Sequence, residues 1–135
     1  MKVAVYRVGN ETIYIERIPS NAKLVKVNGY YAYSKGRIVR RVITEKPSDP
    51  KVVIEYALVL RTSYGKNVDL KIVDHKLGRF IRFKREDGFP IYVNVKTLDV
   101  YVKHSDLRNP VFAKAIGFFL NSCGYRVREK TVMRI

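Results

Sequence analysis

Hydrophobic and polar residues alternate through the first 45 positions of the chain, which predicts β-strands for this part. The alternation is interrupted at Gly9-Asn10, where we expect the turn of a first hairpin. Asn28-Gly29 tolerates positive φ and predicts a tight two-residue turn in a second hairpin. The expected strands cover residues 2–6, 13–16, 24–27, 30–33 and 37–44.

The periodicity changes after Glu45 and predicts a helix. Ser48 or Asp49 is a candidate N-cap, Pro50 suits the first helical position, and Gly65 stands beyond the end. The β-branched run at 52–54 leaves a buried strand open as an alternative. We favour the helix because of its end signals and length. Its expected apolar face consists of Val53, Tyr56, Ala57, Leu60 and Tyr64.

The second half of the chain shows a similar order of elements. Strands are expected at 68–73 and 79–84, then at 91–95 and 98–102 with a turn at Lys96-Thr97. Asn109 and Pro110 predict the start of a second helix, and Gly124 predicts its end. The apolar face of this helix is expected to comprise Phe112, Ala115, Ile116, Phe119 and Leu120.

The order of elements predicts an α+β fold of antiparallel sheets with two helices. Aligning Pro50 with Pro110 also aligns Leu60 with Leu120, which indicates tandem ββββα-like repeats over residues 1–66 and 67–124. A C-terminal strand follows over 125–135, and residues 21–33 suggest an extra hairpin in the first half. A length of 135 residues predicts a single domain, 1–135.

The net charge of the chain indicates which classes of binding partner to expect. The chain holds 27 Lys and Arg against 12 Asp and Glu, a formal net charge of +15. This excess favours polyanions, with nucleic acid first and an anionic membrane surface second. No apolar run approaches the ~18 residues of a membrane span, and no secretion signal is visible, so we expect a cytoplasmic protein without a membrane partner. Abundant charge, a single cysteine and no glutamine are also common in thermophile proteins, which agrees with an archaeal or viral source.

One face of the second-half strands mixes aromatic and basic residues. Unpaired bases stack on aromatic rings, and cations follow the phosphates, so this combination predicts binding of single-stranded DNA or RNA. Alternation along the C-terminal strand places Arg126, Arg128, Lys130 and Arg134 on one side. These residues are further candidates for phosphate contacts, although charged residues also protect edge strands from aggregation. The predicted nucleic-acid-binding residues are Phe80, Arg82, Lys84, Tyr92, Lys96, Tyr101, Lys103, Arg126 and Arg128.

Two successive units of strands and a helix, with basic and aromatic side chains on a sheet face, resemble the Whirly, PUR and PC4-like single-stranded nucleic-acid-binding proteins. The resemblance covers nearly the whole chain and concerns the order of elements, with no family-specific motif. It implies curved antiparallel sheets that present this face to single strands, while helices pack behind or form oligomer contacts. Function therefore still depends on the proposed surface.

Other interpretations remain open. The aromatic face could be covered within the protein or form the interface of a homodimer, as in a small archaeal or viral assembly protein. Tyr30, Tyr31 and Tyr33, near several arginines, are a second aromatic candidate for ligand contacts or hairpin packing.

Enzymatic chemistry has little support in the sequence, so we expect no catalytic residues, no metal and no cofactor. His75, His104 and Cys123 lack metal-ligand spacing, and the glycines form no phosphate-binding loop. A metal-dependent nuclease is the third alternative, because a few converging carboxylates suffice for such a site. Its candidate ligands are Asp69, Asp74, Glu86 and Asp87, although charged turns explain these residues more simply.

Overall fold

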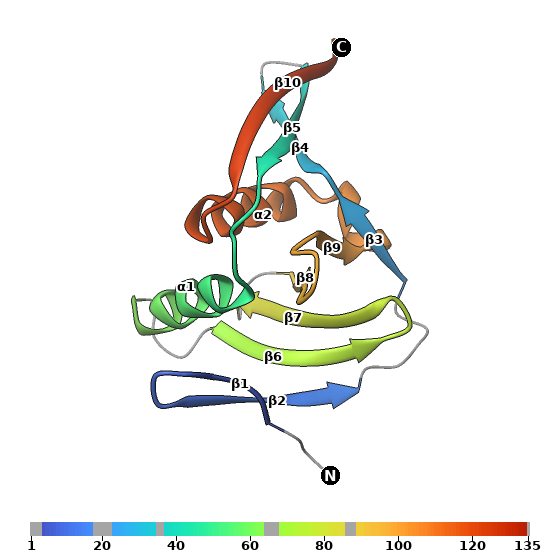
Figure 1. The fold of residues 1–135 in the computed structure, drawn as a ribbon. Coiled ribbons are helices and arrows are strands. Elements are labelled where there is room, and N and C mark those ends of the chain that lie inside the picture. Colours follow the sequence, from blue (N-terminus) through green and yellow to red (C-terminus); the bar gives the residue numbers. More distant parts are fainter. Residues whose placement is uncertain (1–3, 18–22, 35–36, 64–67, 86–88, 135) are drawn as a thin grey trace.

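A computed structural model describes residues 4–17, 23–34, 37–63, 68–85 and 89–134 (Figure 1). In chain order its elements are β1 (Ala4–Val8), β2 (Glu11–Arg17), β3 (Leu24–Val27), β4 (Gly29–Ser34), β5 (Arg37–Glu45), α1 (Pro50–Ser63), β6 (Val68–His75), β7 (Gly78–Arg85), β8 (Ile91–Asn94), β9 (Val100–Lys103), the 3-10 helix η1 (His104–Arg108), α2 (Pro110–Ser122) and β10 (Arg126–Arg134). The predicted α+β class is confirmed.

The described strands form two sheets. The larger has the order β1-β2-β6-β7-β8-β9-β3, and the smaller has the order β10-β5-β4. Neighbouring strands are antiparallel except β2 and β6, which run parallel. Antiparallel neighbours can follow one another through tight turns, whereas the parallel pair requires the long excursion through β3, β4, β5 and α1.

The two halves of the chain share an order of elements but not a pattern of strand pairing. In the second half β6 to β9 pair in sequence, and α2 follows. In the described part of the first half, five strands precede α1. Of these, β2 pairs with β6, β3 pairs with β9, and β4 and β5 belong to the smaller sheet. First-half strands therefore extend both sides of the second-half sheet.

The predicted tight turn at Asn28-Gly29 is wrong. β3 pairs with β9 and β4 pairs with β5, so these two positions carry the chain from one sheet into the other. Gly29 is needed here for a different reason: a Cβ atom at this position would collide with the carbonyl group of Arg41. The glycine permits close approach of two backbones and does not adopt positive φ.

The segment after Pro50 is a helix, as predicted, rather than a strand. The Asp49 side chain caps it by accepting a hydrogen bond from the backbone N–H of Lys51 at 2.8 Å. Its buried face contains Val53, Ile54 and Ala57, whereas Tyr56 is 44% exposed. The predicted position of Tyr56 on the apolar face is therefore wrong. The buried stripe of the helix includes Ile54 and leaves Tyr56 at its exposed side. The side chains predicted at positions 60 and 64, and Gly65, lie outside the described part.

The second helix agrees with its sequence signals. The Asn109 side chain accepts a hydrogen bond from the Val111 N–H at 3.0 Å, and Gly124 follows the helix with φ of +83°. Phe112, Ile116, Phe119 and Leu120 are buried as predicted, and the side chain of Ala115 lies outside the described part. Neither α1 nor α2 is long and apolar enough to cross a bilayer.

The main core lies between the helices and one face of the larger sheet. Its sheet side contains Ile91 and Val93 of β8 and Val100 and Val102 of β9. Phe119 of α2 packs on Phe83 of β7 with ring centroids 4.6 Å apart. Burial of these apolar side chains is the principal driving force for folding at this interface.

The smaller sheet projects from the body beyond α2, and the C-terminus lies at its far end (Figure 1). Near its base, Ile43 of β5 and Val127 of β10 pack against the main core. Just before β10, the buried Tyr125 hydroxyl donates a hydrogen bond to the Leu98 carbonyl oxygen at 2.8 Å. These contacts fix the projecting sheet to the body.

Candidate nucleic-acid interface

Strand register assembles most of the predicted residues on the face of the larger sheet opposite the main core. Tyr92 is the register partner of both Arg82 and Tyr101. Because side chains alternate along a strand, Phe80 and Lys84 share the face of Arg82, and Lys103 shares that of Tyr101. The sheet thus places all six residues on a common face.

The aromatic residues of this face form a second small core. Phe80 is 0% exposed and Tyr92 is 2% exposed, and both pack with Leu24 and Val73. Tyr101 is partly buried against Phe80 in an edge-to-face contact, with centroids 5.0 Å apart. The rings of Phe80 and Tyr92 therefore have no open face on which a base could stack. Alternation in the sequence identified the side of the sheet but not what covers it.

The basic residues around this aromatic cluster differ in their availability. Arg82 is largely buried and forms an ion pair with Asp69 at 3.0 Å. Lys84 is exposed and Lys103 is half-buried. Lys96 is exposed in the turn between β8 and β9, where the Asn94 side chain accepts a hydrogen bond from its backbone N–H. Lys96 is therefore separate from the sheet face on which the other residues lie.

Burial also perturbs the polar groups beside the cluster. It raises the pKa of Tyr92, with opposing effects from the charges of Arg82, which lowers it, and Asp106, which raises it. Burial likewise raises the pKa of Asp106, although the charge of Lys103 opposes the change. Among the described side chains, Arg82 Nε and Asp106 Oδ2 are buried without a hydrogen-bond partner. This part of the face is closed rather than open to a ligand.

A second group of cations lies on the projecting sheet. Arg128 and Lys130 are exposed on β10, and Lys130 is the register partner of Arg40 on β5. Arg126 is 79% exposed and forms an ion pair with Glu45 at 3.2 Å. Within the described chain, Arg40, Arg128 and Lys130 have no acidic partner.

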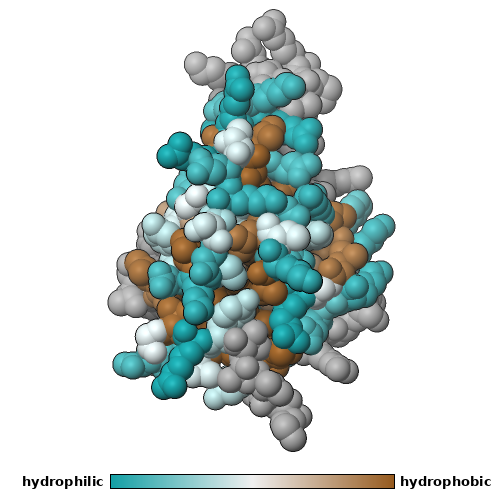
Figure 2. All heavy atoms as spheres, in the orientation of Figure 1, coloured by the Kyte–Doolittle hydropathy of each residue, from teal (hydrophilic) through white to brown (hydrophobic). Residues whose placement is uncertain are grey.

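The two faces of the projecting sheet have different chemistry. Ile43 and Val127 point toward the core, and Arg41 on their side forms an ion pair with Glu129 at 3.1 Å. Regular register between Val127 and Thr131 puts Val42, Arg40, Arg128 and Lys130 on the other side, which we call the outward face. Among the coloured residues of this projecting part, hydrophilic ones predominate in the view of Figure 2.

Like charges face each other across β5 and β10. Arg40 is opposite Lys130, and Arg37 is the register partner of Arg134. Directly opposed like charges destabilise a sheet. The two strands together hold seven Lys or Arg and two Glu, a net charge of +5 out of +15. An anionic ligand would relieve this repulsion.

The sequence identified this second group only in part. Alternation at Arg126, Arg128 and Lys130 placed them on one side of a strand. The opposition of Lys130 to Arg40 joins positions 90 residues apart and leaves no local signal. The side chains of the second aromatic candidate, Tyr30, Tyr31 and Tyr33, lie outside the described part, although register places Tyr31 opposite Arg40.

The carboxylates considered for a nuclease site do not converge where the structure describes them. Asp69 pairs with Arg82, and Asp74 pairs with Arg79 at 2.9 Å. Being five positions apart on β6, Asp69 and Asp74 belong to opposite faces of the sheet. Glu86 and Asp87 lie outside the described residues. In the described chain, no three His, Cys, Asp or Glu side chains gather as metal ligands.

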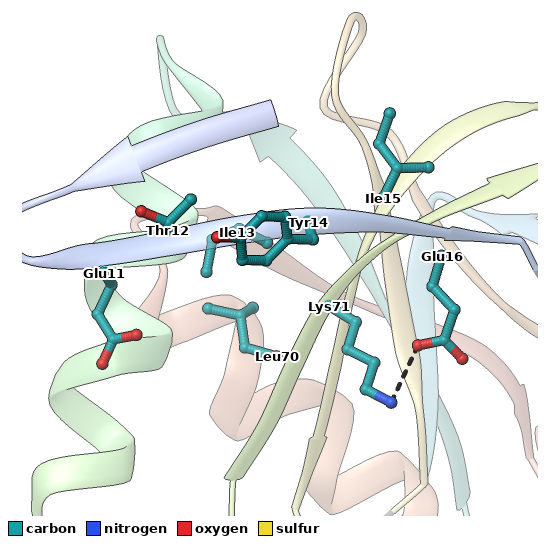
Figure 3. Close-up of a pocket in the computed structure, with 8 residues that line it drawn as sticks. All are labelled: Glu11, Thr12, Ile13, Tyr14, Ile15, Glu16, Leu70 and Lys71. Carbon is teal, nitrogen blue, oxygen red and sulfur yellow. Dashed lines mark ion pairs between the residues drawn. The ribbon is translucent and has the colours of Figure 1, made fainter. Parts of the chain in front are cut away.

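A hollow of about 200 Å³ lies between β2 and β6, where the two strands diverge before their pairing begins at Ile15 and Ile72 (Figure 3). Lys71 at this hollow already forms an ion pair with Glu16 at 2.9 Å, and Glu11 adds another carboxylate. These acids would repel phosphate, so the hollow does not extend the cationic surface. It is lined by Glu11, Thr12, Ile13, Tyr14, Ile15, Glu16, Leu70 and Lys71.

Comparison with known proteins finds no matching family model, curated protein or solved structure. The resemblance to the Whirly, PUR and PC4-like proteins therefore stays a prediction from the order of elements.

Proposed function

We propose that this protein binds nucleic acid through the outward face of the projecting sheet, without catalysis. The observation that carries the proposal is the opposition of Arg40 and Lys130, beside Arg128, with no acidic partner among the described residues. Phosphates would supply the missing counter-charges, and cations that neutralise them release condensed counterions. The high net positive charge would also increase the rate of association with nucleic acid.

The expected preference for single strands has less support than the expected affinity for nucleic acid. That preference depended on stacking of bases against Phe80, Tyr92 and Tyr101, and the first two are buried. Lys84 and Lys103 on the same face remain available for phosphate contacts. Contact with phosphates through the projecting sheet is independent of stacking, so the proposal is centred there.

Fluorescence anisotropy over a range of salt concentrations tests the proposal. Binding by the combined variant Arg40→Gln, Arg128→Gln, Lys130→Gln should weaken, and its log–log salt slope should fall by about two to three units, at ~0.7 to 0.9 per lost phosphate contact. The matched control Arg7→Gln, Lys51→Gln, Lys76→Gln removes the same charge from exposed positions on β1, α1 and the β6–β7 turn. The control should keep most of the slope.

Three results would contradict the proposal. Equal losses in the two variants would show that net charge matters but the outward face does not. Absence of binding by the wild type at moderate salt would favour the assembly alternative, which sedimentation would then support by showing a stable oligomer. Cleavage of an oligonucleotide in Mg²⁺ or Mn²⁺ would contradict the absence of catalysis.

A further inference from the structure

The projecting sheet presents a face formed by paired strands rather than a single edge strand. Its far end extends beyond α2 (Figure 1), while β4 and β10 contact α2. The axes of β5 and β10 lie about 4.8 Å apart, and the nine residues of either strand extend about 30 Å. These dimensions match a groove surface better than a small-molecule pocket.

Among the grooves of DNA and RNA duplexes, the major groove of B-form DNA best matches the dimensions of the projecting sheet. It is about 12 Å wide and admits a two-stranded β-ribbon such as β5 with β10, which carries Arg40, Arg128 and Lys130, whereas the minor groove is only about 6 Å wide. A-form RNA has a deep, narrow major groove that side chains do not read. Right-handed twist along the sheet helps its strands to follow a helical groove.

The chemistry of the outward face also suits that groove. Arginine and lysine make the commonest specific contact there, to O6 and N7 of guanine, and they contact the flanking phosphates as well. Arg40, Arg128 and Lys130 supply these donors, while Glu129 points to the other side in its ion pair with Arg41. The outward face thus offers donors to an acceptor-rich surface.

We infer that the outward face of the β10-β5-β4 sheet docks in the major groove of duplex DNA, with Arg40, Arg128 and Lys130 directed at base edges and adjoining phosphates. This inference rests on the proposed function and names its substrate class. It differs from the single-strand preference expected from the sequence, because the surface that carried that expectation is closed by its own packing.

Binding to four labelled probes tests the inference: a G·C-rich DNA duplex, the same duplex with 7-deazaguanine, the corresponding RNA duplex, and one DNA strand. Replacing N7 by carbon removes a major-groove acceptor and leaves the phosphates unchanged. We expect the DNA duplex to bind most tightly and 7-deazaguanine to weaken binding about 5-fold or more, since one good base contact corresponds to roughly 5- to 150-fold.

The outcomes separate this inference from the proposed function. Equal affinity for the normal and 7-deazaguanine duplexes, or tighter binding of RNA duplex or single strand, would overturn groove docking while nucleic-acid binding stands. Absence of binding to all four probes would overturn both. The combined variant Arg40→Gln, Arg128→Gln, Lys130→Gln should also lose the discrimination between the two DNA duplexes, and the Arg7→Gln, Lys51→Gln, Lys76→Gln control should retain it. Thermal unfolding of each variant verifies that it is folded.

Discussion

At the scale of single residues, the turn between β8 and β9 depends on a contact from far along the chain. Leu98 adopts φ of +60°, which is unfavourable for a side chain with a Cβ atom, yet its side chain is 6% exposed and belongs to the core. The Asn94 side chain accepts hydrogen bonds from the N–H groups of Lys96 and Thr97. The Tyr125 hydroxyl satisfies the Leu98 carbonyl. Local hydrogen bonds and distant packing together hold the strained residue.

Tyr125→Phe should lower the free energy of unfolding by about 1 to 2 kcal/mol, because it leaves a buried carbonyl oxygen without its hydrogen bond. Urea denaturation of the variant measures the effect. Tyr14→Phe removes a hydroxyl from a side chain that is 49% exposed and serves as a control. Equal stability of Tyr125→Phe and wild type would show that this bond contributes nothing.

Burial near the start of β10 should make the protein sensitive to alkali. Burial raises the pKa values of Cys123 and Tyr125 above their ordinary ones. The unfolded chain then loses these protons from about pH 8.5 for the thiol and about pH 10 for the phenol, whereas the folded chain keeps them. The unfolded state binds fewer protons in this range, so the free energy of unfolding should fall as pH rises. Cys123→Ala should flatten the first part of this decline in urea midpoints measured from pH 7 to 10.5, and an unchanged slope would refute the assignment.

The same residues show the limit of what the sequence can predict. Alternation placed Phe80 and Tyr92 correctly on the side away from the main core, since that depends only on the period of a strand. Their burial depends on Leu24 and Val73 from other strands. No local pattern encodes such cover, so an aromatic face and a second core have the same sequence signature.

At the scale of elements, Asp99 connects three segments that are distant in the chain. At the start of β9, its carboxylate pairs with Lys26 of β3 at 3.4 Å and with Lys46, which follows β5. Burial alone would raise its pKa, but hydrogen bonds from Lys46 and Thr97 and the nearby lysine charges outweigh that effect and lower the pKa. Asp99 thus helps to fix the edge strand and the base of the projecting sheet.

Asp99→Asn should lower the free energy of unfolding by about 1 to 2 kcal/mol at pH 7, as expected for the loss of charged hydrogen bonds. Because the folded pKa is lowered, the stabilisation by Asp99 is present above its unfolded pKa of about 3.9 and disappears as pH falls through the folded value. The difference between variant and wild type should therefore shrink below about pH 4. Urea titrations at pH 7 and pH 3 measure this change, and a constant difference would contradict it.

Elements with local signals were the predictable part of the fold. Asp49 and Asn109 cap the two helices as side-chain chemistry requires. The division of β3 and β4 between two sheets was not predictable, because Asn28-Gly29 has the composition of a hairpin turn and only the pairing of β3 with β9 overrides it. At this position the local sequence is compatible with a hairpin turn, and pairing between distant strands determined the structure instead.

At the scale of the whole molecule, charge is unevenly distributed and opposes compact folding. The net charge of +15 creates self-repulsion, and part of it is concentrated across β5 and β10. On the larger sheet, ion pairs such as Lys71 with Glu16 and Arg79 with Asp74 neutralise several cations. On the outward face, Arg40, Arg128 and Lys130 have no such partner among the described residues.

Raising NaCl from about 10 to 200 mM should increase the melting temperature, because salt screens repulsion between exposed charges. The increase should be smaller for the Arg40→Gln, Arg128→Gln, Lys130→Gln variant, which lacks the opposed cations. Differential scanning calorimetry of both proteins measures this difference. An identical salt response would show that repulsion on the outward face has no effect on stability.

The pairing of strands across the chain also sets an order of events in time. In the described structure, β2, β3 and β5 cannot complete their pairing until β6, β9 and β10 have been synthesised. The pairs β1 with β2 and β4 with β5 are close in the sequence and can form early. Closing such long loops costs entropy before the contacts form, and proteins dominated by distant pairings fold on millisecond to second timescales. A ribosome-bound chain that has exposed only its first half can thus form two hairpins and a helix but no complete sheet. The cationic face would be assembled late, once β10 has joined β5.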